Sequence, residues 1–109
     1  MAQEEFTKSN IFQFPAKVDY SSGGIVSKKV LKKDTGNISL FAFDAGEGLS
    51  EHTAPFDALI QVVEGMAEII INRKSYLLET GDAIIMPADI PHAVKAPEKF
   101  KMVLTMIRS

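Results

Sequence analysis

Apolar residues occur in short runs along the chain, and each run ends at residues that favour turns. The runs lie at 25–31, 38–43, 58–63, 67–71, 76–78, 83–86, 93–94 and 100–107. Glycine, proline, asparagine and aspartate separate them, so that a turn recurs about every ten residues. Short runs rich in Val, Ile, Phe and Leu with this spacing predict an all-β sandwich or barrel and leave little room for helices.

Two segments give the strand prediction in more detail. Between Phe100 and Ile107 apolar and other residues alternate, which places Phe100, Met102, Leu104 and Met106 on one face of a strand. Residues 67–72 and 75–78 are predicted to pair as a hairpin, with the polar turn at 73–74.

The chain is short enough to form one domain, and its first twenty residues are predicted to lie at the edge of that domain. We expect one domain over 1–109, in which 1–20 forms an edge or partner-crossing segment, because Pro15 is unsuited to a central strand.

Phe41 and Phe43 alternate with Leu40 and Ala42, so both faces of that strand are apolar. One face then belongs to the core and the other covers something else, which predicts a homodimer.

Two spaced motifs carry most of the remaining information. Residues 46–65 read Gly-x5-His-x-Ala-x3-Ala-x6-Gly, and residues 81–96 read Gly-x5-Pro-x-Asp-x2-His-x3-Ala. This resembles the cupin superfamily, whose motifs are G-x5-H-x-H-x3,4-E-x6-G and G-x5-P-x-G-x2-H-x3-N. The resemblance covers about half of the chain and implies a double-stranded β-helix, the jelly-roll cupin barrel.

The departures from the family motifs concern the metal ligands. Ala54 stands at the position of the second histidine and Ala58 at that of the glutamate, while Asp89 and Ala96 replace a glycine and an asparagine. The resemblance therefore leaves His52 and His92 as metal ligands. Either Asp57 or Gln61 is a possible third ligand, although a regular strand would turn both away from the barrel. A metal held here would be a divalent transition ion such as Zn, Ni, Fe or Mn.

His52 and His92 are the only histidines. If both project into one cavity, they are weak metal ligands, a proton shuttle or hydrogen-bond donors to an anionic ligand; otherwise they are polar groups satisfied by water and by each other. Met86 and Met102 are predicted to line the same pocket, and the alternative is that they fill the core as ordinary methionines do.

The composition of the chain limits the kinds of partner and the cellular location that we expect for it. With 12 basic and 14 acidic residues the net charge is −2, and the basic residues are scattered, which is atypical of nucleic-acid binding. The chain has no cysteine, which excludes thiolate metal sites and cysteine nucleophiles. No apolar run approaches the roughly 20 residues of a membrane span, and the acidic start is unlike a signal peptide, so we expect a cytoplasmic protein.

Three functions remain open. The first is a small-molecule-binding cupin of unassigned specificity without an obligatory metal, which takes an apolar or anionic metabolite. The second is a cupin enzyme, either a metal-dependent dioxygenase, isomerase or decarboxylase with a reduced ligand set or a metal-free acid–base catalyst. The third is a structural domain whose interior is filled by Phe and Met side chains. Because two of the four family ligands are absent, the first is favoured.

Overall fold

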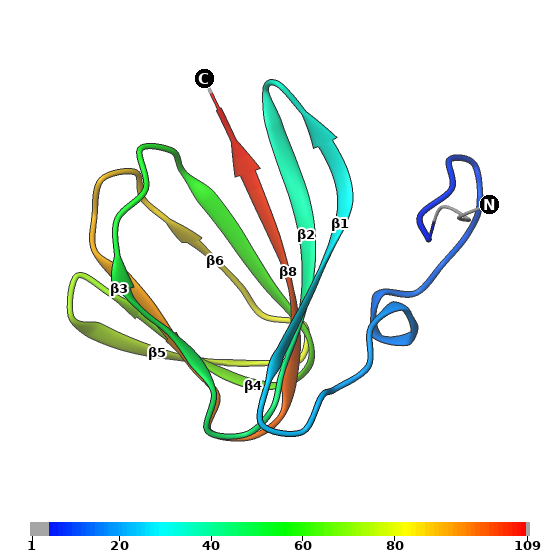
Figure 1. Ribbon diagram of the computed structural model, residues 1–109. Coiled ribbons are helices and arrows are strands. Elements are labelled where there is room, and N and C mark those ends of the chain that lie inside the picture. The colour runs from blue at the N-terminus through cyan, green and yellow to red at the C-terminus, as the bar shows by residue number, and fades with distance from the viewer. Residues whose placement is uncertain (1–4, 109) are drawn as a thin grey trace.

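The computed structural model describes residues 5–108, and these are built almost entirely of antiparallel strands (Figure 1). A short 3-10 helix, η1 (Phe14–Lys17), precedes the strands. The strands are β1 (Ile25–Lys33), β2 (Gly36–Phe43), β3 (Gly48–His52), β4 (Ala58–Ile71), β5 (Lys74–Glu79), β6 (Ala83–Met86), β7 (His92–Lys95) and β8 (Phe100–Ile107). The predicted all-β barrel is confirmed. Among the described residues no helix is long and apolar enough to cross a membrane.

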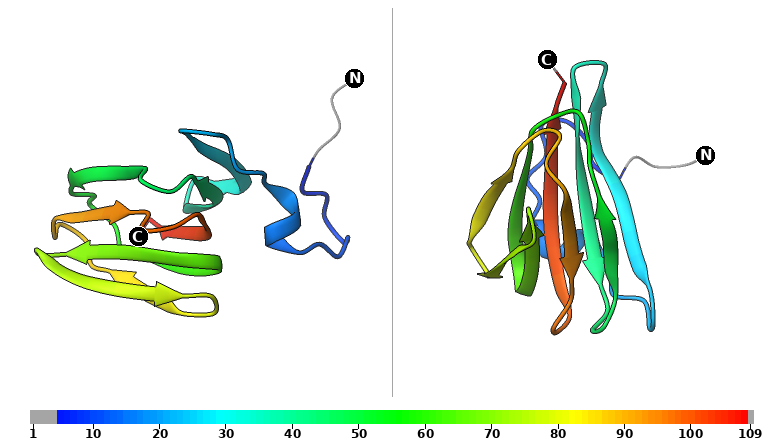
Figure 2. Two further views of the ribbon diagram at one scale, coloured as in Figure 1. Left: turned by 90° about the horizontal axis from the view of Figure 1, so that it is seen from below. Right: turned by 90° about the vertical axis from the view of Figure 1, so that its left-hand side faces the viewer.

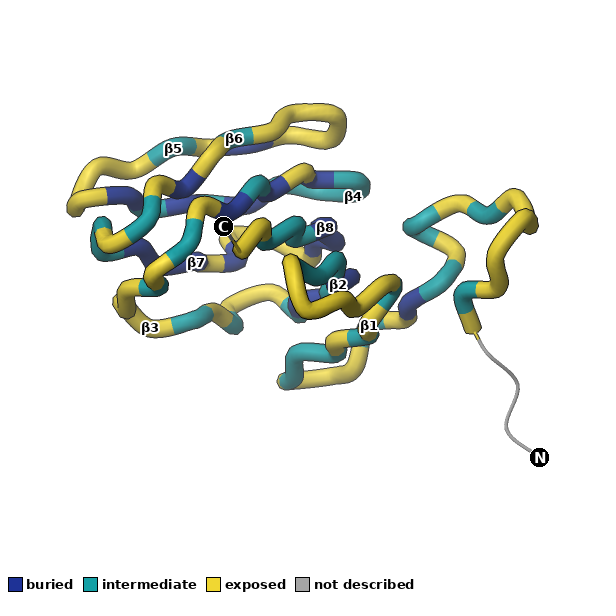
Figure 3. The backbone as a smooth tube through the Cα atoms, turned by 90° about the horizontal axis from the view of Figure 1, so that it is seen from above, coloured by how far each residue is buried: buried dark blue, intermediate teal, exposed yellow. Residues whose placement is uncertain are grey.

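The strands form two sheets that share β4. In sheet A the order is β6–β4–β8–β2–β1, and in sheet B it is β5–β4–β7–β3. Residues 58–65 of β4 pair with β8 in sheet A, whereas residues 66–71 pair with β5 in sheet B. The sheets curl around a common interior, on which buried residues of β4, β7 and β8 converge (Figure 3).

Gly65 allows β4 to pass from one sheet to the other. Its φ is +84°, a left-handed conformation, and a Cβ at this position would collide with the carbonyl oxygen of Lys99. Only glycine meets both demands at low cost. The last glycine of the first motif therefore has a structural explanation that requires no ligand.

The closed end of the barrel is filled by aromatic side chains. Phe43 of β2 and Phe100 of β8 stack with their ring centroids 4.6 Å apart, and both are fully buried. Met102 and Leu104 continue the inward face of β8, which confirms the alternation predicted for this strand. The interior at this end of the barrel is thus occupied by packed side chains.

The predicted hairpin corresponds to β4 and β5. Ile71 pairs with Lys74, so the two turn residues are Asn72 and Arg73, one position earlier than expected. Both have positive φ, 51° and 66°, as a type I′ turn requires. Asparagine tolerates this conformation well, which explains why the turn begins there.

The N-terminal segment does not form the edge strand that was one of its two predicted roles, while the other role, crossing to a partner chain, stays a prediction. Within residues 5–20 no edge strand forms; the chain runs through η1 and then crosses the outer face of sheet A (Figures 1 and 2). Pro15 lies inside η1, where its fixed φ suits the turn. Residues 1–4 lie outside the described part of the chain.

This segment covers part of the second apolar face of β2. Val18 is buried in a cluster with Leu40, Ala42 and Val103, while Phe43 faces the interior. The apolar character of both faces of β2 is therefore explained within one chain, and it no longer requires a second subunit. The prediction of a homodimer has to rest on other surfaces.

Candidate functional site

The two histidines meet at the open end of the barrel. His52 ends β3 and His92 begins β7, and the two residues are partners in the ladder that joins these strands. Their Nε2 atoms are 3.1 Å apart. His92 is only 6% exposed, whereas His52 is open to solvent. The pair therefore lies between the interior and bulk water.

The backbone fixes the tautomer of both rings. Nδ1 of His52 lies 2.7 Å from the carbonyl oxygen of Ser50, and Nδ1 of His92 lies 3.2 Å from that of Ile90. A carbonyl oxygen only accepts hydrogen bonds, so each Nδ1 carries the proton and donates it. Each neutral ring then has its lone pair on Nε2. The two Nε2 lone pairs consequently point at each other. A shared proton, a hydrogen-bond donor or a cation between them would stabilise this arrangement.

Burial decides the charge of the inner histidine. Desolvation lowers the pKa of His92 below its ordinary value and outweighs the hydrogen bond to Ile90, which raises the pKa; a charge on His52 would add a smaller lowering effect. His92 is therefore neutral at physiological pH. The inner half of the pair acts as a hydrogen-bond acceptor at its Nε2 atom.

A small apolar cavity lies behind the pair, between the two sheets. Its volume is about 60 Å³, room for about two waters. The predicted pocket residues His52, His92, Met86 and Met102 all line it. The other lining residues are Leu49, Ala54, Ala58, Ile60, Val94, Leu104 and Met106. The only polar atoms contributed by side chains are thus those of the two imidazoles.

The structure does not bring the two candidate third ligands to the histidines. Asp57 is exposed, and its Oδ1 accepts a hydrogen bond of 2.7 Å from the backbone amide of Ala88. Gln61 is also exposed, and neither residue lines the cavity. Ala54 and Ala58 do line it, at the positions where the family motif has a histidine and a glutamate.

These residues do not fit a tightly held metal ion. An ion about 2.05 Å from both Nε2 atoms would have an N–metal–N angle of about 100°, which tetrahedral and octahedral ions accept. Within residues 5–108, however, no three His, Cys, Asp or Glu side chains are grouped as a metal site requires. Two imidazoles alone leave most coordination positions to water or to a ligand.

Comparison with known proteins agrees with this geometry. The family model described as "Cupin domain" matches residues 39–108. The chain belongs to the cupin family. No functionally curated protein matches it significantly. The matched segment contains both histidines and all residues that line the cavity.

Several solved structures share the fold of this chain. A conserved protein of unknown function from Streptococcus pyogenes is 28% identical, with a TM-score of 0.91 over 97% of this chain and 93% of that one. A "Cupin 2 conserved barrel domain protein" from Leptotrichia buccalis is 36% identical, with a TM-score of 0.83 over 86% and 46% of the two chains. Salicylate 1,2-dioxygenase from Pseudaminobacter salicylatoxidans, 18% identical, has a TM-score of 0.72 over 78% and 26%.

The sequence did not predict every residue of the site. Leu49 and Val94 face the cavity from β3 and β7, where the strands are too short for a clear alternation. Met106 was within reach of prediction, because it shares a face with Met102 in the alternating pattern of residues 100–107. The mutual contact of the two imidazoles depends on the register of β3 and β7, which no local pattern reveals.

Proposed function

We propose that this chain is a small-molecule-binding cupin without an obligatory metal, and that its ligand is an apolar molecule with one hydrogen-bond-donating group. The observation that carries the proposal is the 3.1 Å separation of the Nε2 atoms of His52 and His92 at the mouth of an apolar cavity. A hydroxyl group placed there would donate to one lone pair and exclude water from the other. An anionic group would face two acceptors, so a carboxylate is disfavoured while the pair is neutral.

The size of the cavity limits how deeply a ligand enters. About 60 Å³ accepts the polar end of a molecule but not a whole metabolite, since typical ligand pockets are several times larger. Met86, Met102 and Met106 line the cavity, and methionine side chains adapt easily to a guest. The body of the ligand would rest at the mouth, against exposed His52, or displace these side chains.

Three probes with one ring size test the proposal: phenol, benzene and benzoate. The readout is the NMR signals of the two imidazoles, which are the only histidine rings in the protein. Phenol is expected to shift both rings and to bind about two- to tenfold more tightly than benzene, the value of one net hydrogen bond. The variant His92→Leu, which removes the inner acceptor, should lose most of this preference for phenol. Benzoate binding as tightly as phenol above pH 7.5, or no ring shift with any probe, would refute the proposal.

A metal-dependent enzyme is the second candidate function. The angle of about 100° at an ion between the two Nε2 atoms supports it, as does the fold shared with salicylate 1,2-dioxygenase. In that case substrate oxygens would have to complete the coordination. Elemental analysis of protein purified without chelator distinguishes the candidates: one metal ion per chain that survives dialysis would favour the enzyme, and its loss on dialysis would favour the binding protein.

The expected cytoplasmic location and the homodimer remain proposals. Cell fractionation with an antibody to the chain tests the location. The homodimer is supported by apolar surface on the outer face of sheet A that the N-terminal segment leaves uncovered.

A further inference from the structure

Two loops cross the open end of the barrel side by side and in opposite directions (Figures 1 and 2). Residues 53–57 lead from β3 of sheet B to β4 where it belongs to sheet A, and residues 87–91 lead from β6 of sheet A to β7 of sheet B. We call these two loops together the strap. Because each loop joins one sheet to the other, the strap spans the gap between the sheets at this end.

The strap lies over the cavity behind the histidines. The residues at which its loops leave the strands are His52, Ala58, Met86 and His92, and all four line that cavity. Ala54, within the first loop, lines it as well. The cavity holds only about 60 Å³, so the body of a ligand that reaches the Nε2 atoms has to pass beside the strap or move it.

Two hydrogen bonds tie the loops of the strap to each other. The backbone amide of Ala88 donates to Oδ1 of Asp57, and the amide of Asp89 donates to the carbonyl oxygen of Ala54, each over 2.7 Å. Asp89 has a φ of +63°, a left-handed conformation that aspartate tolerates. A left-handed residue lets successive amides face the same side, and here both face the neighbouring loop.

Each loop is stiff, so the strap opens by separation of its two loops. Proline fixes φ, and Pro55 lies within the first loop while Pro87 and Pro91 bound the second. The second loop is also held at its base, where the amide of Asn72 donates to the carbonyl oxygen of Pro91 over 2.8 Å. The link between the loops is weaker than this base, because the carboxylate of Asp57 is exposed and water competes for it.

We propose that the strap opens to admit the body of the ligand, and that Asp57 is the positioning residue that holds the strap closed. The inference rests on the proposed function, because it concerns entry to the same cavity. A ligand that needs the open strap binds with an affinity reduced by the fraction of molecules in which the strap is open. Asp57 thus limits the size of the molecule that the site accepts.

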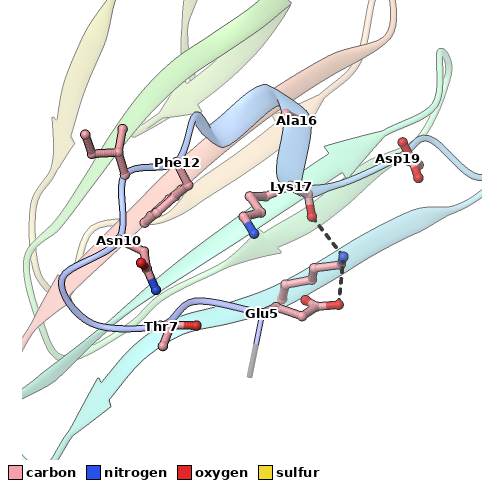
Figure 4. A pocket seen from close by; sticks show the side chains of 9 residues that line it. Glu5, Thr7, Asn10, Phe12, Ala16, Lys17 and Asp19 are labelled. Carbon is pink, nitrogen blue, oxygen red and sulfur yellow. Dashed lines mark hydrogen bonds and ion pairs between the residues drawn. The ribbon is translucent and has the colours of Figure 1, made fainter. Parts of the chain in front are cut away.

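A larger groove, of about 610 Å³, lies between the N-terminal segment and β1, on the other side of the molecule from the strap (Figures 1 and 4). In this groove Lys28 donates to the carbonyl oxygen of Lys17 over 2.8 Å and to Glu5 over 3.1 Å. Four of the residues that line it are charged, namely Glu5, Lys17, Asp19 and Lys28. Burial of charged groups against an apolar guest is costly, so an apolar ligand with one donor is better placed in the cavity.

Hydrogen–deuterium exchange of single amides, followed by NMR, measures the opening of the strap. Asp57→Ala removes the acceptor of the Ala88 amide but leaves both partners of the bond between Asp89 and Ala54 in place, so the amide of Asp89 reports on opening. We expect its exchange to become about tenfold faster in Asp57→Ala, the value of one hydrogen bond to an exposed charged group. Asp57→Asn keeps an acceptor oxygen and should stay within about threefold of wild type.

Asp44→Ala is the matched control. The carboxylate of Asp44 likewise accepts a hydrogen bond of 2.7 Å from a backbone amide, that of Gly23, but it lies just after β2 at the closed end of the barrel. Exchange at Asp89 should be unchanged in this variant. Exchange at Asn72 should be unchanged in every variant, because the base of the second loop stays bonded. Far-UV circular dichroism confirms that each variant is folded.

The size of the ligand supplies the second measurement. 2-Naphthol carries the same hydroxyl group as phenol on a larger body. Asp57→Ala should bind 2-naphthol about tenfold more tightly than wild type does, by the same factor as the rise in exchange at Asp89, while the affinity for phenol changes less. Titrations followed at the two imidazoles and at the backbone amides give the dissociation constants and the place of binding.

The outcomes separate this inference from the proposed function. Unchanged exchange at Asp89 in folded Asp57→Ala, or an equal rise in Asp44→Ala, would overturn the strap whether or not a probe binds. Faster exchange without a gain in 2-naphthol affinity would overturn the role of Asp57 in admitting the ligand, while phenol binding at the imidazoles would leave the proposed function standing. Binding of 2-naphthol at residues 5–19 and not at the imidazoles would overturn the inference as well, and binding of neither probe to either protein would refute both.

Discussion

Lys101 is a buried lysine whose replacement by methionine should loosen the N-terminal segment. Its side chain lies on the outer face of sheet A with only a few per cent exposed, and its Nζ donates to the carbonyl oxygen of Pro15 over 2.7 Å. Nζ also lies 3.4 Å from Oε2 of Glu64 and 4.8 Å from the centre of the Tyr20 ring. Tyr20 donates to the same carboxylate over 2.6 Å. Three parts of the chain, the N-terminal segment, β4 and β8, are thus joined at one ammonium group.

The magnitude follows from these contacts. A hydrogen bond from a charged donor contributes about 1.5–3 kcal/mol, and methionine keeps the apolar stem while it removes the donor. Glu64 is 43% exposed and stays solvated, so no stranded charge adds to the loss. We expect Lys101→Met to lower the free energy of unfolding by about 2 kcal/mol and the Tm by about 8 °C.

The assay combines thermal unfolding with hydrogen–deuterium exchange. Exchange should rise in residues 14–20 at temperatures where the strands remain protected, because the lost bond anchors that segment. The control is Lys95→Met, at an exposed position on β7, which should change the Tm by no more than about 2 °C. Equal effects of the two variants, or exchange that rises uniformly across the strands, would refute this account of Lys101.

Three further predictions follow from the fold and the site. Gly65→Ala should destabilise the protein by about 3 kcal/mol in urea unfolding, whereas Gly46→Ala, with φ +88° but no atom near the added Cβ, should cost about 1 kcal/mol; equal costs would contradict the close approach to Lys99. Phe100→Ala should cost about 3–5 kcal/mol through loss of the stack with Phe43, and a loss under 1 kcal/mol would contradict it. The pKa of His92 is lower in the folded chain than in the unfolded chain, so the unfolded chain takes up the proton first as the pH falls. The free energy of unfolding should therefore decrease as the pH drops below about 6.5, until His92 of the folded chain is protonated as well. Urea unfolding across this range should show a smaller loss in His92→Gln, and an equal loss would assign the effect to other groups.

Most of the fold could be predicted from the sequence. The alternation of residues 100–107 identified the inward face of β8, and the polar turn after Ile71 identified the β4–β5 hairpin to within one residue. These features are local, and side-chain periodicity records them directly. The spacing of Gly46, His52, Gly65, Gly81, Pro87 and His92 identified the family.

The remainder depends on contacts between distant segments. Residues 5–20 are apolar enough for a strand, but whether they pair at an edge or cover a face depends on Leu40 and Val103, far along the chain. The same applies to Lys101, which sequence patterns would place in solvent although it is buried by Pro15 and Tyr20. The 3.1 Å contact of the two imidazoles is set by strand register, and the spacing of the motifs predicts proximity without that detail.

The most direct test of the site is the protonation pattern of the two imidazoles, measured by long-range proton–nitrogen NMR correlation on uniformly labelled protein at about pH 8. The bonds to the carbonyl oxygens of Ser50 and Ile90 predict that both rings carry their proton on Nδ1, with both Nε2 atoms unprotonated, and that ring protons of His52 and His92 show a mutual nuclear Overhauser effect. A proton on Nε2 of either ring, or no contact between the rings, would contradict the converging acceptors on which the proposed function depends.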